Sequence, residues 1–321
     1  MRLIFLGSPE PVLAPLKTLL EEGPRHGHTV VGVVSQPARP VGRGRAPVDP
    51  PVAAFARRLG LPVLQPEKAA DPAFLAAFAA LAPDVAVTAA YGQILTPAFL
   101  QIPRRATINI HPSLLPRYRG ATPVPAALLA GDTESGVTVL FTVQRLDAGN
   151  IITQERLLID EHETAGELTS RFFTSGGRLT LAALEKLKDP AYCGTPQDET
   201  QVSLCRKIQK TDGLIDWHKP ALATVCRFRA FAPWPGSFTF LGDRRLALTA
   251  LQTAPAGTPA AAPGVVTYDR KRQTLLVGTS DGVIAVERLK PAGGKEVDAA
   301  AFWNGLKDKN AVVFANAASA P

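Results

Sequence analysis

The sequence predicts an α/β protein in which a doubly wound, mostly parallel sheet is followed by a smaller β-barrel domain. Short apolar, β-branched runs alternate with helical patterns through the first half of the chain, as they do in parallel sheets. The last third instead carries closely spaced strand-like runs separated by Gly, Asp and Pro, which is typical of small antiparallel barrels. A length of 321 residues fits two such domains.

The N-terminal elements begin with a strand–helix–strand unit. Residues 2–6 form an apolar run, residues 12–20 have helical spacing, and residues 29–34 are β-branched and apolar. Further strands are predicted at 84–89, 106–110 and 136–142, and further helices at 52–59, 72–81, 122–131 and 164–188. This alternation predicts a Rossmann-like sheet whose ligand site lies at the carboxyl edge of the strands.

The C-terminal elements follow a polar segment with no periodicity. Strand-like runs occupy residues 236–241, 246–251, 264–268, 273–278 and 282–289. We therefore predict a Rossmann-like domain over residues 1–189, a linker over 190–204, and an OB-like β-barrel over 205–314.

The composition excludes several classes of protein. Hydrophobic residues make up 46% and charged residues 20% of the chain, which is enough apolar material for a packed core. Apolar runs fall well short of the roughly 18 residues that a membrane helix needs, so no membrane contact is expected. The three cysteines lack C-x-x-C spacing, so we expect neither disulfides nor zinc, and a reducing, cytoplasmic location.

The formal charge of +7 is concentrated in the last third of the chain. Residues 1–200 carry 19 basic and 19 acidic side chains, whereas residues 201–321 carry 16 basic and 9 acidic ones. A concentrated positive field attracts polyanions such as nucleic acid. Taken alone, the charge is equally consistent with a solvated basic surface.

The end of the first strand argues against a dinucleotide cofactor. It reads Gly7-Ser8-Pro9-Glu10 rather than G-x-G-x-x-G. Pro9 and Glu10 place neither flexibility nor positive potential where a pyrophosphate would lie. We therefore predict that the sheet edge serves a different chemistry.

Polar residues gather where the strand at 106–110 ends. Asn109 and His111 are two residues apart, so their side chains point to one face, at the carboxyl edge. An Asn amide can donate to a developing oxyanion, and a His can move a proton near neutral pH. Asp147 follows the strand at 136–142, and in a parallel sheet that strand would end at the same edge. Taken alone, the Asn-x-His pair is more typical of an ordinary strand end, and Asp147 is more typical of an ordinary turn.

Three motifs around these residues resemble the active site of the tetrahydrofolate-dependent formyltransferases. They are Asn-x-His-x-Ser-Leu-Leu-Pro over 109–116, Gly-Asp-x-x-x-Gly-Val-Thr over 131–138, and Leu-Asp-x-Gly over 146–149. The similarity extends from Arg2 to about Trp303. Within this family the chain is most similar to members that act on charged initiator tRNA, because of the basic loop at 36–45 and the segments at 207–217 and 229–236.

The resemblance implies an activity and roles for three residues. A formyl group would pass from 10-formyltetrahydrofolate to the α-amino group of methionyl-initiator tRNA, for translation initiation. Asn109 would hold the oxyanion, and His111 would stabilise it and shuttle the proton. Asp147 would set the His tautomer or accept the proton of the amine. No metal and no covalent nucleophile on the enzyme are expected.

The resemblance also implies contacts with the folate and the tRNA. Ser113, Leu114, Leu115 and Pro116 would border the folate and offer free backbone polar groups. The residues proposed to contact tRNA are all basic: Arg39, Arg43, Arg45, Lys207 and Lys210. Each is individually as consistent with a solvated surface cation. Trp234, between two prolines, is predicted to fill the barrel core rather than to stack on a base. The expected assembly is a monomer.

Two other interpretations share parts of this pattern. A formyltransferase acting on glycinamide ribonucleotide or on a nucleotide-linked amino sugar would carry the same three residues. The enzyme that acts on glycinamide ribonucleotide would lack the barrel, and the enzyme that acts on the amino sugar would lack the basic loop around Arg43. An RNA-binding protein that had kept the fold without catalysis would have lost one of the three residues, and all three are present.

Overall fold

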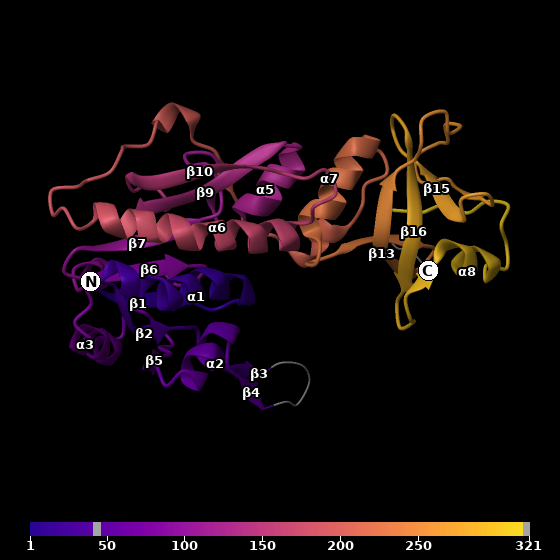
Figure 1. Cartoon of the computed structure of the whole chain (residues 1–321). Coiled ribbons are helices and arrows are strands. Elements are labelled where there is room, and N and C mark those ends of the chain that lie inside the picture. Colours follow the sequence, from indigo (N-terminus) through magenta and orange to yellow (C-terminus); the bar gives the residue numbers. More distant parts are fainter. Residues whose placement is uncertain (41–45, 317–321) are drawn as a thin grey trace. The chain divides into compact units, whose positions relative to one another are not determined.

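The chain forms two compact units in a computed structural model that describes residues 1–40 and 46–316 (Figure 1). The N-terminal unit comprises Met1–Pro123, Thr133–Ile159 and Glu167–Arg206. The C-terminal unit comprises Val124–Asp132, Asp160–Gly166 and Lys207–Pro321. The chain therefore passes between the units several times, whereas the sequence predicts one linker.

A seven-stranded sheet organises the N-terminal unit. Its strand order is β10 (Ile151–Leu158), β9 (Glu134–Phe141), β7 (Ala106–His111), β6 (Val85–Ala89), β1 (Arg2–Gly7), β2 (Thr29–Val34) and β5 (Val63–Leu64). The five strands from β7 to β5 are parallel, which confirms the predicted parallel sheet. β9 runs antiparallel to β7, and β10 runs antiparallel to β9. The sheet is therefore antiparallel on the β9 side of β7, the strand that carries Asn109 and His111.

The helices of this unit largely match the predicted ones. They are α1 (Leu13–Glu21), α2 (Pro51–Arg58), α3 (Pro72–Ala80), α4 (Pro97–Leu100) and α6 (Ala165–Lys186). Short strands and 3-10 turns complete it: β3 (Arg39–Pro40), β4 (Pro47–Val48), β8 (Arg119–Gly120), β11 (Leu204–Cys205), η1 (Glu10–Val12), η2 (Gly23–His26) and η3 (Glu199–Gln201). Within the described residues, no helix has both the length and the apolarity of a membrane span.

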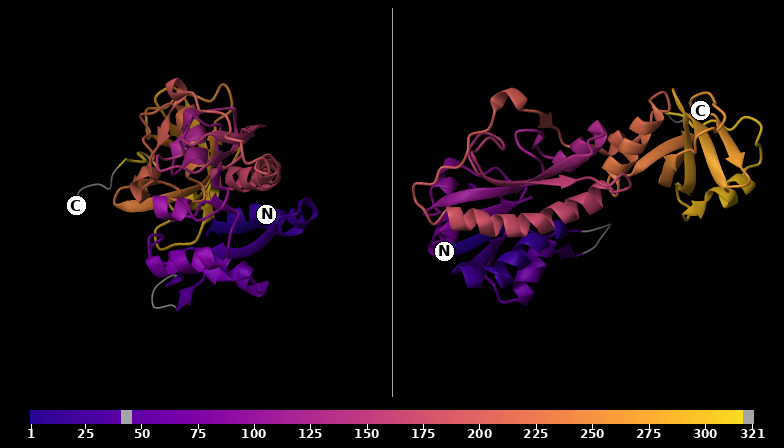
Figure 2. Two further views of the ribbon diagram at one scale, coloured as in Figure 1. Left: turned by 90° about the vertical axis from the view of Figure 1, so that its left-hand side faces the viewer. Right: turned by 45° about the horizontal axis from the view of Figure 1, so that its top comes forward.

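The two faces of the sheet are covered differently. On one face, Ile4 and Leu6 of β1 pack with the aromatic rings of α3 and α4, where Phe78 and Phe99 lie 4.6 Å apart. On the other, α6 lies against β7, as Figures 1 and 2 show. A Cβ at Gly176 of α6 would come within 2.7 Å of Ile110, so glycine permits this close approach.

This packing fixes the direction of the polar side chains on β7. Paired residues in neighbouring strands share a face, and Ile4 pairs with Ala86, which pairs with Thr107. Asn109 and His111 lie two and four residues after Thr107, so they share the face of Ile4, away from α6. The helix α6 therefore does not cover the Asn109 and His111 side chains.

Antiparallel strands form the core of the C-terminal unit. Their order is β12 (Ser237–Leu241), β13 (Arg244–Thr253), β16 (Val283–Pro291), β15 (Thr274–Gly278) and β14 (Val266–Asp269), with β17 (Val297–Asp298) beside β16. The accompanying helical elements are α5 (Pro123–Ala130), η4 (Lys210–Gly213), α7 (Ala221–Phe231) and α8 (Ala299–Asn304). Among the described residues β12 and β14 do not pair, so a closed barrel is not shown.

Trp217, not Trp234, fills the core of this unit. Trp217 is 1% exposed, packs 6.0 Å from the ring of Phe314, and donates from Nε1 to Thr239 Oγ1 at 3.0 Å. Trp234 is 54% exposed, so the prediction that it fills the core is wrong. Trp234 lies in the turn after α7, where no helix or strand periodicity directs its side chain inward.

Substitutions of the two tryptophans should lower stability by different amounts. Trp217→Ala should lower the free energy of unfolding by about 3–5 kcal/mol, because it opens a cavity and leaves the Thr239 hydroxyl without its donor. Trp234→Ala should lower it by less than about 1 kcal/mol, since the ring is already half solvated. Urea unfolding of both variants measures the difference. Equal losses would contradict this assignment of the core.

Candidate active site

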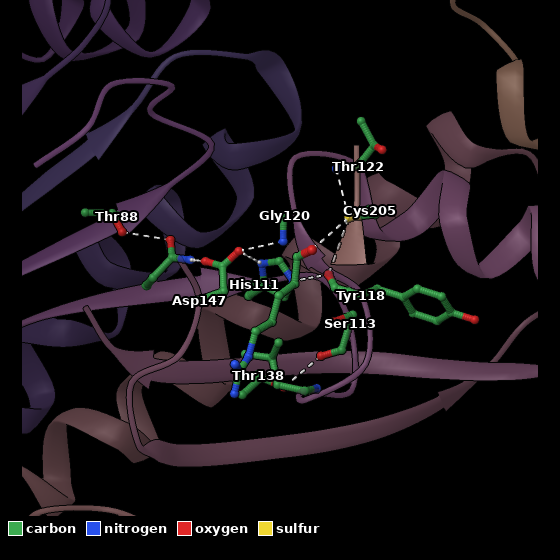
Figure 3. Close-up of polar contacts among 12 residues, drawn as sticks. Thr88, His111, Ser113, Tyr118, Gly120, Thr122, Thr138, Asp147 and Cys205 are labelled. Carbon is green, nitrogen blue, oxygen red and sulfur yellow. Dashed lines mark hydrogen bonds and ion pairs between the residues drawn. The ribbon is translucent and has the colours of Figure 1, made fainter. Parts of the chain in front are cut away.

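The candidate site lies where β7 ends. Asn109 is within this strand and His111 is its last residue. Thr88 of the neighbouring β6 stands in register with Asn109. Asp147 reaches both residues from the loop after β9, so the three predicted residues come together. Figure 3 shows Asp147 facing His111 and bonded to Gly120.

The hydroxyl of Thr88 orients the Asn109 amide. Thr88 Oγ1 donates to Asn109 Oδ1 at 2.7 Å and lies 3.1 Å from the carbonyl oxygen of Ile108. Because the amide oxygen is thereby occupied, the amide nitrogen Nδ2 turns toward Asp147, 3.5 Å from Oδ1. The side chain that could stabilise an oxyanion is thus held with its donor facing the site.

A backbone carbonyl fixes the tautomer of His111. His111 Nε2 lies 2.9 Å from the carbonyl oxygen of Tyr118. Since a carbonyl only accepts, Nε2 carries the proton and Nδ1 is the nitrogen with a free lone pair. Nδ1 faces Asp147 Oδ2 at 3.6 Å, which is beyond a hydrogen bond but within reach of ion pairing. No sequence pattern marked Tyr118 for this role.

Asp147 arrives by a different route from the predicted one. β9 is antiparallel, and its last residue Phe141 pairs with Ile108, so the strand ends away from His111. The prediction of two parallel strands ending at one edge is therefore wrong for β9. A loop returns the chain to the site, where Gly120 N donates to Asp147 Oδ2 at 2.9 Å. Asp147 has φ 47°, a left-handed conformation that Asp adopts more readily than most residues.

The backbone groups of the segment predicted to border the folate form hydrogen bonds within the protein. Thr138 Oγ1 donates to the carbonyl of Ser113 at 2.7 Å and accepts from the amide of Leu115 at 3.2 Å. Gln154 Nε2 donates to the carbonyl of Leu115 at 3.0 Å. The prediction of free backbone groups here is wrong, because antiparallel β9 places Thr138 opposite His111 and directly against this loop. The segment Ser113–Pro116 supports the strand end that carries His111.

Residues from the predicted linker complete the site. Gln197 Nε2 donates to the carbonyl of Asp147 at 2.8 Å, and Ser203 Oγ accepts from the amide of Tyr118 at 2.9 Å. β11 then pairs with β8 in parallel. This stretch is polar and aperiodic, so its sequence carries no signal that it returns to the site.

A cysteine thiol lies beside the same loop. Cys205 Sγ donates toward the carbonyl of Tyr118 at 3.5 Å and accepts from the amide of Thr122 at 3.4 Å. Burial raises the pKa of Cys205, and the negative charge of Asp147 raises it further. The thiol is therefore protonated at neutral pH and acts as a hydrogen-bonding group.

The predicted tRNA-binding residues are distributed over both units. Arg39 is exposed and pairs with Glu67 at 2.5 Å in the N-terminal unit. Lys207 and Lys210 are exposed in the C-terminal unit. Arg43 and Arg45 lie outside the described residues.

The geometry suits attack of an amine on a carbonyl carbon. The amide nitrogen of Asn109 and Nδ1 of His111 lie 3.5 and 3.6 Å from the two carboxylate oxygens of Asp147. Such a set can stabilise an oxyanion and move a proton without a covalent intermediate. Residues 1–40 and 46–316 contain no cluster of three His, Cys, Asp or Glu side chains able to hold a metal.

The chain is similar to known proteins over nearly its full length. Family models described as "Formyl transferase" and "Formyl transferase, C-terminal domain" match residues 1–184 and 207–307. A protein of Roseiflexus castenholzii named methionyl-tRNA formyltransferase is 40% identical over 307 residues, which cover 96% of each chain.

Solved structures share the fold at low sequence identity. WlaRD, a sugar 3N-formyl transferase crystallised with dTDP and 5-N-formyl-THF, matches with a TM-score of 0.65 and 16% identity over 89% of this chain and 97% of its own. HypX from Aquifex aeolicus in complex with tetrahydrofolic acid matches with a TM-score of 0.63 and 16% identity. That match covers 98% of this chain but only 50% of HypX. These similarities confirm the predicted formyltransferase fold.

The Thr88–Asn109 hydrogen bond predicts a stability effect. Thr88→Val keeps the shape of the side chain but leaves Asn109 Oδ1 without its donor, which should cost about 1–3 kcal/mol of unfolding free energy. Thr88→Ser keeps the hydroxyl and is the matched control, expected to lose less. Chemical denaturation measures both. A Thr88→Val protein as stable as the parent would show that the hydroxyl does not hold the amide.

Proposed function

The chain belongs to the formyl transferase family, and we propose that it formylates the α-amino group of methionyl-initiator tRNA with 10-formyltetrahydrofolate. As a member of this family it is an enzyme that transfers formyl groups. One observation carries the choice of acceptor: full-length similarity to a methionyl-tRNA formyltransferase, in a chain whose Asn109, His111 and Asp147 converge. The product would serve translation initiation in the cytoplasm.

The proposed reaction needs no covalent bond to the enzyme. The neutral amine attacks the formyl carbon, and the carbonyl electron pair moves to oxygen to give a tetrahedral oxyanion. The oxyanion then collapses, the bond from carbon to the folate nitrogen breaks, and that nitrogen leaves with a proton. The amine loses one proton over the same sequence, so the protons balance.

The three residues divide this work. Asn109 Nδ2 donates to the oxyanion, and its orientation by Thr88 supports that role. His111 accepts and releases the transferred proton at Nδ1, because the proton on Nε2 is bonded to the carbonyl of Tyr118. Asp147 faces Nδ1 and balances the charge of the imidazolium that forms. The resemblance offered two roles for Asp147. Setting the tautomer is unnecessary, because the hydrogen bond from His111 to the carbonyl of Tyr118 already does so, and accepting the proton of the amine stays a proposal.

We propose that the folate binds beside this strand end. Exposed apolar side chains occur in the loops after β6 and β9, namely Ile94 and Leu146, and Leu146 directly precedes Asp147. Exposed apolar groups next to buried polar residues suit a flat heteroaromatic ring. In this proposal Ser113, Leu114, Leu115 and Pro116 form the floor of the site rather than its hydrogen-bonding partners.

We infer that the C-terminal unit is an OB-like barrel that contacts tRNA. Residues after α8 support closure: Ala315 N donates to the carbonyl of Phe240 in β12 at 2.8 Å, and Phe314 N donates to the carbonyl of Gly264, just before β14, at 2.8 Å. The positive charge of this unit supports tRNA as its ligand, since the whole formal excess of positive charge lies in residues 201–321. Lys207, Lys210 and Arg39, with Arg43 and Arg45, stay proposed tRNA contacts.

The proposed division of labour keeps the predicted boundaries. Residues 1–189 would carry catalysis, residues 190–204 would connect the domains and also supply Gln197 and Ser203 to the site, and residues 205–314 would bind tRNA. The competing acceptors are glycinamide ribonucleotide and a nucleotide-linked amino sugar. The full-length relative favours tRNA, whereas the sugar enzyme among the solved structures shares only the fold.

An acceptor panel tests the proposed function. The purified protein is incubated with 10-formyltetrahydrofolate carrying a labelled formyl group and with charged initiator tRNA, glycinamide ribonucleotide or a nucleotide-linked amino sugar. Label should appear on the tRNA, because an acceptor-binding domain with concentrated positive charge favours a polyanion. Uncharged tRNA is the control. Label on either small amine and none on charged tRNA would exclude the proposed acceptor.

The role of His111 predicts a separable kinetic effect. His111→Ala should lower kcat by about 10²–10⁴-fold and change KM by less than about threefold, since the imidazole acts mainly in the transition state. His162→Ala is the control, because His162 is exposed and its ring pairs with its neighbour Glu161. Steady-state kinetics with charged initiator tRNA measures both. Unchanged turnover in the His111 variant would contradict the mechanism.

A further inference from the structure

We propose that Gln197 and Arg119 are positioning residues that hold Asp147 in the geometry required for formyl transfer. The proposal rests on the proposed function of the site. Neither residue belongs to the group predicted from the sequence, and neither contacts His111 through its side chain. Gln197 binds the backbone of the loop that carries Asp147, and the side chain of Arg119 binds Gln197.

Asp147 is held at two points. Its carboxylate accepts from Gly120 N at 2.9 Å, and its own carbonyl oxygen accepts from Gln197 Nε2 at 2.8 Å. The same Nε2 donates to the carbonyl of Gly149 at 2.8 Å. Gln197 therefore spans the loop on either side of Ala148, and it holds a residue whose φ of 47° is not one the free chain favours.

Arg119 determines which way the Gln197 amide faces. Its Nε and Nη2 both donate to Gln197 Oε1, at 3.0 and 2.7 Å. With the amide oxygen taken by two guanidinium donors, the amide nitrogen must face Asp147 and Gly149. Arg119 is 2% exposed, so this guanidinium has no solvent to exchange with.

Glu199 balances the buried charge of Arg119. It accepts from Arg119 Nη2 at 2.9 Å and also pairs with Arg145. Hydrogen bonds from Arg119 and Arg145 lower the pKa of Glu199, so its carboxylate stays ionised at neutral pH. Arg145 lies two residues before Asp147, and the loop is thus tied to the same cluster a second time.

The backbone of Arg119 connects this cluster to His111. The preceding residue, Tyr118, accepts from His111 Nε2, and the following residue, Gly120, donates to the Asp147 carboxylate. One side chain and its two flanking peptide groups therefore set both members of the His–Asp pair. A displacement of about 1 Å in such a site can lower the rate about a hundredfold.

Only an amide satisfies both neighbours of residue 197. A carboxylate there would pair with Arg119 but would repel the carbonyl oxygens of Asp147 and Gly149. Gln197→Glu consequently separates the two functions: it keeps an acceptor for Arg119 and removes the donor to Asp147. Gln197→Met removes both contacts at similar side-chain length.

The experiment compares these variants with the full-length parent. Gln197→Glu should lower kcat about a hundredfold with KM for both substrates within about threefold, and its melting temperature should stay within about 3 °C. Gln197→Met should also lower kcat, but less, because it adds no repulsion. Gln201→Glu, the same change on an exposed residue of the same segment that bonds Asp198, should leave kcat unchanged within about twofold.

A second readout does not depend on activity. The amide of Gly120 is protected by its bond to Asp147, so its hydrogen exchange should be faster in Gln197→Glu than in the parent and the Gln201→Glu control. All kcat values are divided by the folded fraction from circular dichroism, so that loss of folded protein is not counted as loss of turnover.

The two readouts separate this proposal from the proposed function. A Gln197→Glu protein with parental kcat and parental exchange at Gly120 overturns the positioning role while leaving formyl transfer intact. If the parent fails to formylate tRNA but exchange at Gly120 still accelerates in the variant, the proposed acceptor fails and the positioning role stands.

Discussion

The backbone on either side of Arg119 is the constraint on which the site depends. The carbonyl of Tyr118 accepts from His111, and the amide of Gly120 donates to Asp147. The two peptide groups are planar and meet at Arg119, and the pairing of β8 with β11 holds the backbone dihedrals between them, so the two polar groups keep one relative orientation. They hold the imidazole in one tautomer and the carboxylate opposite its free nitrogen. Asn109 needs a separate anchor, which Thr88 supplies from the next strand.

The rest of the N-terminal unit stabilises this short segment from two sides. Antiparallel β9 places Thr138 under the loop after His111, where its hydroxyl binds the backbone on both sides of Leu114. The segment containing Gln197 and Ser203 returns over the other side and bonds to Asp147 and Tyr118. Elements far apart in the chain thus leave the site few ways to relax, as oxyanion stabilisation by preorganised donors requires.

Charge and chemistry are divided between the two parts of the sequence. Residues 1–200 are formally neutral and contain the three converging residues, whereas residues 201–321 carry the positive excess. A formally neutral catalytic domain has no general attraction for polyanions. A basic domain can bind a tRNA through its phosphates. In the proposed enzyme, affinity for the large substrate and transition-state chemistry are thereby assigned to different surfaces.

The sequence alone determined the local features of this protein. Alternating strand and helix patterns predicted the parallel strands, and the two-residue spacing of Asn109 and His111 predicted their common face, because side chains alternate along any strand. The motif around them pointed to formyl transfer. Tertiary structure decided the rest: the antiparallel direction of β9, the support by Gln197, and the exposure of Trp234. Periodicity reports how a segment packs against its nearest layer, but strand direction and the return of a distant polar segment depend on contacts between residues dozens of positions apart, which no local pattern encodes.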